Sequence, residues 1–162
     1  MTNGGREVRL ALAGNPGGYT EMLQALLGDG QPKHMLLALN VRAGHRGRSG
    51  HPGRPGSYRP DVSWIWDIDF ESLRGLAGAA VVSGNRATDL AVRLKYAGWL
   101  AAKAGAGPAD IAVEPDPVRG FQLALARTPA GQPVWALSNS LILGRLGDWL
   151  LRQGYAGMRA ER

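Results

Sequence analysis

Residues 61–71, DVSWIWDIDFE, hold the highest density of chemically useful side chains in the chain. Four carboxylates and two tryptophans fall within these eleven residues. The first carboxylate, Asp61, directly follows a basic segment, so it could orient a histidine or bind a cationic group. Alternatively, Asp61 caps a turn and the tryptophans pack in the core. The residues alone favour neither interpretation.

A second candidate lies in residues 84–98, GNRATDLAVRLKYAG, most of which are expected to be helical. Arg86, Asp89 and Arg93 are three and four residues apart, so they share one helix face. For Asp89 and Arg93 this spacing favours a solvated ladder of ion pairs. Arg86 differs because it lies where a strand gives way to the helix. A guanidinium at that position could hold a carboxylate or phosphate through two hydrogen bonds.

The third candidate is the turn GNPGG at residues 14–18, between a predicted strand and a predicted helix. Backbone amides in such a turn can converge on an anion, helped by the helix N-terminus. An ordinary strand-to-helix turn without a ligand is the favoured interpretation of these residues, with their glycines allowing positive φ.

Several kinds of catalytic site are excluded by what the sequence lacks. It has no cysteine, which excludes a disulfide scaffold, a thiolate zinc site and a cysteine nucleophile. No lysine precedes Ser or Thr as a Walker A loop requires, and no G-x-S-x-G elbow is present. The three histidines, His34, His45 and His51, do not form a helical pair, so we expect no metal site.

The net charge of +6 is concentrated in one segment. Residues 41–60 contain five arginines and no acid, among many glycines and prolines. We expect this segment to be a mobile, solvated loop. It could attract a polyanion in a salt-dependent way, but within it only Tyr58 could stack on a base. Nucleic acid is therefore not the expected partner.

The order of apolar runs and breakers predicts strands that alternate with helices. This alternation favours an α/β sandwich around a mainly parallel sheet, in which ligands meet the loops after the strands. All three candidate segments lie in or next to such loops. Strands are expected at 8–13, 35–39, 78–83, 110–113 and 134–137, and helices at 19–27 (with Thr20 as cap), 87–98, 117–127 and 141–153.

The length of 162 residues fits one domain, which we assign to residues 1–162. The start MTNGG has no apolar signal-peptide core, and no apolar run approaches the length of a transmembrane segment. We therefore expect a soluble, cytoplasmic protein.

Four segments in this order form an extended pattern: NPGGYTE at 15–21, an apolar strand ending at Asn40, DVSWIWDIDFE at 61–71 and SGNRATDLAVRLKYAG at 83–98. The pattern resembles the C-terminal domain of MurT, the Mur-ligase-like subunit of lipid II isoglutaminyl synthase. It covers most of residues 8–100. The resemblance implies a three-layer, Rossmann-like sandwich such as the C-terminal domain of Mur ligases.

The resemblance also implies a function. MurT activates the D-glutamate carboxylate of the lipid II stem peptide with ATP, and its partner GatD, a class I glutamine amidotransferase, releases ammonia from glutamine. GatD contributes a cysteine and a histidine, and the MurT C-terminal domain contributes the acid. By motif position this acid is Asp61, with Asn15, Asn85 and Arg86 as weaker candidates for substrate contact. Asp67, Asp69 and Glu71 are expected to be structural or interface residues.

Three departures from the family pattern limit these implications. The ATP loop and cysteine zinc ribbon of the MurT central domain are missing, so this chain is expected to hold no cofactor and not to act alone. ATP and Mg²⁺ are expected only on a central domain, which could be a separate chain. The segment 41–60 replaces a short loop, and the last third matches weakly. A stand-alone interaction module or a polyanion binder stays open as an alternative.

Overall fold

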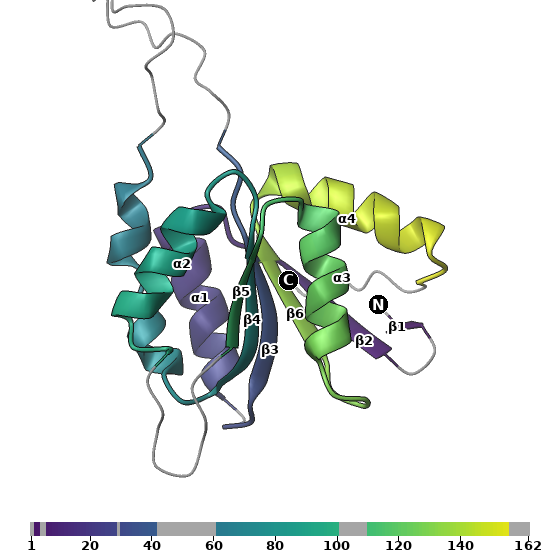
Figure 1. Ribbon diagram of the computed structural model, residues 1–162, viewed down its shortest axis with the longest axis horizontal. Helices are drawn as coiled ribbons and strands as arrows, with labels where there is room; N and C mark the ends of the chain where they lie inside the picture. Colours follow the sequence, from purple (N-terminus) through teal and green to yellow (C-terminus); the bar gives the residue numbers. More distant parts are fainter. Residues whose placement is uncertain (1, 4–5, 29, 42–60, 101–109, 156–162) are drawn as a thin grey trace, which may run out of the picture.

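The computed structural model describes residues 2–3, 6–28, 30–41, 61–100 and 110–155 (Figure 1). Apart from Val41, the segment predicted to be a mobile loop lies outside these residues. The described residues form a six-stranded sheet in the order β1-β2-β6-β3-β4-β5. Its strands are β1 (Thr2–Asn3), β2 (Arg6–Leu12), β3 (Lys33–Ala38), β4 (Ala77–Ser83), β5 (Asp110–Glu114) and β6 (Val134–Ser138).

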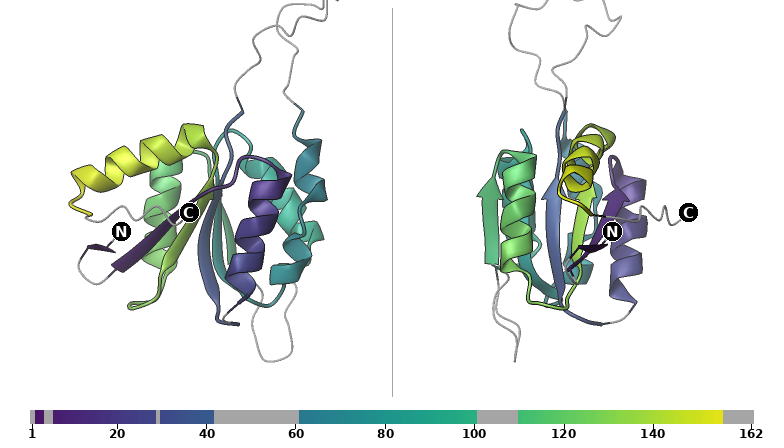
Figure 2. Two further views of the ribbon diagram at one scale, coloured as in Figure 1. Left: turned by 180° about the vertical axis from the view of Figure 1, so that it is seen from behind. Right: turned by 90° about the vertical axis from the view of Figure 1, so that its right-hand side faces the viewer.

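The strands from β2 to β5 are all parallel to their neighbours, and only the short β1 pairs antiparallel with β2. The central strand β3 is buried along its whole length, as a strand covered on both faces must be. β5 lies at one edge of the sheet and the β1–β2 pair at the other (Figure 2). The predicted mainly parallel sheet is confirmed, whereas β1 was not predicted.

Helices cover both faces of the sheet, so the fold has three layers (Figure 1). One layer packs on the sheet face formed by Met35, Leu37 and Val82. The other layer packs on the opposite face, formed by Leu36, Ala38 and Val81. The first layer holds α1 (Pro16–Leu27), α2 (Ala87–Tyr96) and two 3₁₀ helices, η1 (Ser63–Asp67) and η2 (Phe70–Leu73); the second holds α3 (Pro117–Arg127) and α4 (Ser140–Arg152). The predicted three-layer α/β sandwich, Rossmann-like in topology, is confirmed.

The first helix begins earlier than the sequence predicted. Asn15, not Thr20, is the N-cap of α1, because its Oδ1 accepts a hydrogen bond from the Gly18 amide at 2.8 Å. Pro16 then occupies the first helical position, where its missing N–H has no consequence. The Thr20 hydroxyl instead donates to the Pro16 carbonyl at 2.9 Å, inside the helix. The other predicted elements differ from the observed ones by one or two residues at their ends.

Aromatic side chains fasten residues 63–73 to the first helical layer. The buried Tyr19 ring of α1 lies 6.1 Å from Trp64 and 5.8 Å from Phe70, between centroids. Phe70 meets Trp99 edge to face at 6.0 Å, and the Trp99 indole N–H donates to the Phe70 carbonyl at 2.8 Å. Trp64 and Phe70 therefore pack against α1, and Phe70 also contacts Trp99, which follows the end of α2.

At the carboxyl edge of the sheet, the loops after β3 and β4 lie in direct contact. The Arg86 amide donates to the Leu39 carbonyl at 3.2 Å, and the Asn85 amide donates to Asn40 Oδ1 at 2.8 Å. Gly84 makes this approach possible. It has φ +90°, and an added Cβ would lie 2.7 Å from the Leu39 carbonyl carbon.

Replacing Gly84 by alanine is therefore expected to destabilise the fold by roughly 2–5 kcal/mol, from left-handed backbone strain plus the steric clash. Gly131→Ala is the matched control. Gly131 has φ +80° but nothing within 4 Å of an added Cβ, so it should lose only roughly 1–2 kcal/mol. Urea unfolding of both variants measures the difference. Equal losses would show that the contact between the loops is not tight.

Candidate functional site

Asp61 lies two residues before the start of η1 and is exposed to solvent. Its Oδ1 accepts a hydrogen bond from the Ser63 amide at 2.8 Å, so the side chain closes the turn that begins the 3₁₀ helix. This hydrogen bond, a second one from the Ser63 side chain and the positive charge of Arg86 lower the pKa of Asp61 below its usual range. Asp61 is thus a turn residue and also an accessible, ionised carboxylate at neutral pH.

A pocket of about 310 Å³ opens beside Asp61. Residues of 61–66 form one wall and the first two turns of α2 form the other. The lining residues are Asp61, Val62, Ser63, Ile65, Trp66, Arg86, Thr88, Asp89 and Val92. Both signs of charge therefore face the same hollow, together with the half-exposed Trp66 ring. A partner side chain that enters the pocket would meet a carboxylate acceptor and a guanidinium donor.

Arg86 reaches this pocket from the N-terminal end of α2. Its Nη1 lies 3.3 Å from Asp89 Oδ2, one turn further along the helix. The predicted ladder between Asp89 and Arg93 is wrong, because Asp89 pairs with the arginine on its other side. Arg93 points into the protein instead.

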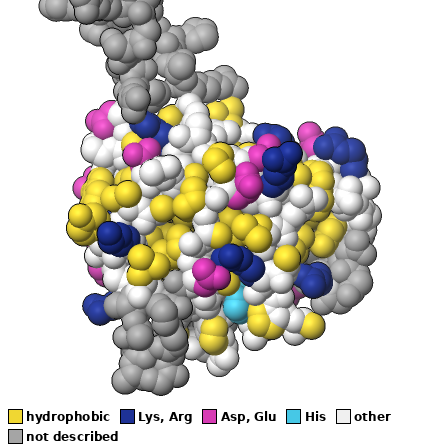
Figure 3. Space-filling model, in the orientation of Figure 1, with side chains coloured by type: hydrophobic (Ala, Val, Ile, Leu, Met, Phe, Trp, Pro, Cys, Tyr) yellow, Lys and Arg dark blue, Asp and Glu magenta, His cyan; other side chains and the backbone are white. Residues whose placement is uncertain are grey.

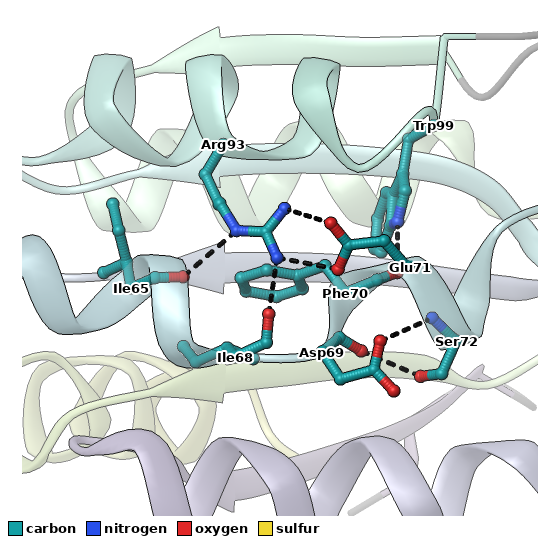
Figure 4. Close-up of polar contacts among 8 residues, drawn as sticks. All are labelled: Ile65, Ile68, Asp69, Phe70, Glu71, Ser72, Arg93 and Trp99. Atoms are coloured by element: carbon teal, nitrogen blue, oxygen red, sulfur yellow. Dashed lines mark hydrogen bonds and ion pairs between the residues drawn. The ribbon is translucent and has the colours of Figure 1, made fainter.

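Arg93 is buried, with 4% of its side chain exposed, and it binds three groups of residues 65–71 (Figure 4). Its Nε donates to the Ile65 carbonyl at 3.2 Å and its Nη2 to the Ile68 carbonyl at 2.6 Å. Nη1 and Nη2 also donate to the two carboxylate oxygens of Glu71 at 2.8 and 2.7 Å. Such a bidentate, charge-assisted arrangement fixes the orientation of both side chains.

Aromatic rings and the carboxylate compensate for burial of this guanidinium. The Arg93 Cζ lies 5.5 Å from the Trp66 ring centroid and 5.4 Å from that of Phe70. The hydrogen bonds from Arg93 lower the pKa of Glu71 below its ordinary value. Sequence spacing could not reveal this pair, since its members are 22 residues apart and belong to different elements.

Two of the other carboxylates of this segment, Asp69 and Glu71, have the structural role expected for them. Asp69 caps η2, because its Oδ1 accepts from the Ser72 amide at 3.2 Å. Glu71 is the partner of Arg93. Asp67 is exposed at the end of η1.

Asn85 sits beside Arg86, but its side-chain amide is engaged with the backbone. Its Oδ1 accepts from the Val41 amide at 3.0 Å and its Nδ2 donates to the Val41 carbonyl at 2.8 Å. Asn40 joins this network through the Asn85 amide, and the Asn139 side chain donates to the Asn40 carbonyl. Asparagines thereby connect the loops after β3, β4 and β6.

Of the predicted site residues, the structure brings Asp61 and Arg86 together in one pocket. Asn85 lies next to them in the chain and clamps Val41. Asn15 follows β2, two strands away from β3 across β6, and its side chain caps α1. A role of either asparagine in substrate contact stays a prediction.

No group of three or more His, Cys, Asp or Glu side chains in the described parts of the chain could hold a metal ion. His45 and His51 lie outside those parts.

None of the helices formed by the described residues has the length and apolar character needed to cross a bilayer. On the face shown in Figure 3, acidic and basic side chains are interspersed, with no continuous basic surface. The arginines of residues 42–59 are outside the described residues.

Fold and site together define a three-layer α/β domain with an ionised acid at the carboxyl side of a parallel sheet. A family model described as MurT ligase C-terminal matches residues 12–114, which is more than half of the chain. The chain therefore belongs to the MurT ligase C-terminal family, as the motifs of the sequence predicted. Comparison with the curated proteins gives no match.

The Arg93 contacts lead to a prediction about stability. Arg93→Met would leave two buried carbonyls without their donor, and we expect it to lower the free energy of unfolding by roughly 2–4 kcal/mol. Arg145→Met, which removes an exposed pair with Asp116, should cost less than about 1 kcal/mol.

The variant Glu71→Gln tests the same ion pair through the pH dependence of the free energy of unfolding. The pKa of Glu71 is lowered on folding, so its ionised form stabilises the native state above the unfolded value of 4.5. This stabilisation is lost as the pH falls through the lower, folded pKa. Urea unfolding from neutral to acid pH should therefore show a smaller acid loss in Glu71→Gln than in the wild type. Identical acid losses would contradict the ion pair.

Proposed function

We propose that this chain is the part of a peptidoglycan-amidating ligase that donates an acidic residue to a partner glutaminase. The complex would amidate the D-glutamate of the lipid II stem peptide. ATP and Mg²⁺ would act on a Mur-ligase central domain, which activates the glutamate carboxylate. A GatD-type class I glutamine amidotransferase would supply ammonia from glutamine.

The observation that carries the proposal is the state of Asp61. Its carboxylate is exposed, ionised and fixed in direction by the Ser63 amide, at the mouth of a pocket that Trp66 borders. An isolated domain gains little stability from such a group, since a single hydrogen bond to a turn is a small term. A binding partner could gain more from this carboxylate, because a histidine of the partner could donate a hydrogen bond to it.

The chemistry assigns each group a task. The Asp61 carboxylate would accept a hydrogen bond from Nδ1–H of the partner's histidine. This fixes the tautomer in which Nε2 is free to take the proton of the partner's cysteine thiol, and it stabilises the imidazolium that forms. The resulting thiolate attacks the carboxamide carbon of glutamine, and the imidazolium returns its proton to the departing nitrogen so that ammonia leaves. Water then hydrolyses the thioester to glutamate and frees the cysteine. Glutamine hydrolysis would then depend on assembly of the two chains.

Arg86 favours the ionised form of Asp61. The hydrogen bonds from Ser63 are the main cause of the lowered pKa of Asp61, and the positive charge of Arg86 adds to them. Asp89 lies 3.3 Å from the Arg86 guanidinium. An acid with a raised pKa would be protonated part of the time and would then fail to orient an imidazole.

The experiment measures glutamate release from glutamine by a GatD-type glutaminase with and without this chain. Wild-type chain is expected to stimulate release. Asp61→Asn should bind the glutaminase but lose at least about 100-fold of the stimulation, because loss of an orienting carboxylate can cost about 10⁴-fold in a serine protease triad. Asp67→Asn is the matched control, since Asp67 is an exposed acid of the same segment, and it should keep full stimulation.

Two results would contradict the proposal. If Asp61→Asn stimulates as well as the wild type, Asp61 is not the acid. If the wild-type chain neither binds nor stimulates the glutaminase, a degenerate domain or a polyanion binder becomes the better account.

A further inference from the structure

We infer that Arg93 is a positioning residue for Asp61, and this inference rests on the proposed function of Asp61. Arg93 does not line the pocket beside Asp61. It acts on the segment that carries Asp61 through the backbone carbonyls of Ile65 and Ile68.

The path from Arg93 to Asp61 consists of short polar contacts. Arg93 donates to the Ile65 carbonyl, and the Ile65 amide donates to the Val62 carbonyl at 3.0 Å. The neighbouring Ser63 amide donates to Asp61 at 2.8 Å. Because η1 is a short 3₁₀ helix of five residues, a shift at Ile65 moves both the Val62 carbonyl and the Ser63 amide.

Helix α2 connects the two arginines that determine the surroundings of Asp61. Arg86 and Arg93 are seven residues apart, about two turns or about 10 Å along one face of the helix. Arg86 faces the pocket with Asp61, and Arg93 holds residues 65–71. One helix thus connects the Asp61 segment, which Arg93 holds, to Arg86, which lines the pocket beside Asp61.

Residues 61–68 and residues 69–73 are held by partly different contacts. In the second part, Phe70 packs on Tyr19 and its carbonyl accepts from the Trp99 indole. In the first part, Ile65 and Ile68 are buried and Trp64 packs on Tyr19, so these residues stay on the domain without Arg93. Arg93 orients their backbone by donating to the Ile65 and Ile68 carbonyls. Loss of Arg93 should therefore shift the backbone of residues 61–68 while the domain stays folded. We therefore expect the Asp61 carboxylate to be displaced from its position beside the pocket.

The test is a double-mutant cycle in complex with a GatD-type glutaminase. Arg93→Lys and Arg93→Met are each made alone and together with Asp61→Asn. The measurements are kcat and KM for glutamine and Kd of the complex, below the melting temperature of every variant. Arg93→Lys keeps the buried positive charge on a single donor nitrogen. It therefore tests the proposal if Arg93→Met does not fold. Arg127→Met, which breaks a pair with Asp110 on other elements, is the matched control.

Each Arg93 variant alone is expected to lower kcat by roughly 10- to 100-fold, as a displacement of about 1 Å in a catalytic group can do. KM for glutamine and Kd should stay unchanged, because glutamine binds on the partner. In the Asp61→Asn background the Arg93 substitutions should have no further effect on kcat. Arg127→Met should match the wild type.

Equal losses of kcat in both backgrounds would overturn the positioning role and leave the proposed function intact. A loss explained by weaker binding would also overturn it, because Arg93 would then only stabilise the interface. If Asp61→Asn alone leaves kcat unchanged, the proposed function itself fails, and the inference about Arg93 fails with it.

Discussion

The buried guanidinium of Arg93 is the interaction on which the candidate site depends. Residues 61–73 form two short 3₁₀ helices, which bring few hydrogen bonds of their own. The carbonyls of Ile65 and Ile68 would face the interior without donors if Arg93 did not donate one hydrogen bond to each. The cation in turn needs the carboxylate of Glu71, because an unpaired buried charge is strongly destabilising. Residues 61–73 and helix α2 therefore stabilise each other.

Around this pair, the carboxyl edge of the sheet is built from loops that hold one another through polar backbone contacts. Gly84 lets the turn after β4 touch the Leu39 carbonyl, and Asn85 clamps Val41. Those constraints place the start of α2, and with it Arg86, beside Asp61. The Asp61 carboxylate is held by a hydrogen bond from the Ser63 amide, and the positive charge of Arg86 helps to lower its pKa. A group so arranged is suited to receive a hydrogen bond from a second protein.

Much of the fold follows from local patterns. Apolar runs bounded by Gly and Pro predicted the five parallel strands, and Pro117 predicted the start of α3. The long motifs identified the family. The position of Arg93 could not be predicted, because helix spacing favours its neighbour Asp89 as partner, whereas tertiary packing turns it towards Glu71. Likewise, the sequence offered Asn15 and Asn85 as substrate contacts, while each amide binds nearby backbone. Side chains in turns compete for such backbone groups, and only the fold shows which they reach.

The central claim, that Asp61 completes a partner's glutaminase site, is tested most directly by a structure of this chain bound to a GatD-type glutaminase. The measurement is the distance from the Asp61 carboxylate oxygens to Nδ1 of the partner's catalytic histidine. The account predicts a hydrogen-bond distance of about 2.6–3.2 Å. A catalytic histidine whose Nδ1 pairs with an acid of its own chain, with Asp61 facing solvent, would contradict it.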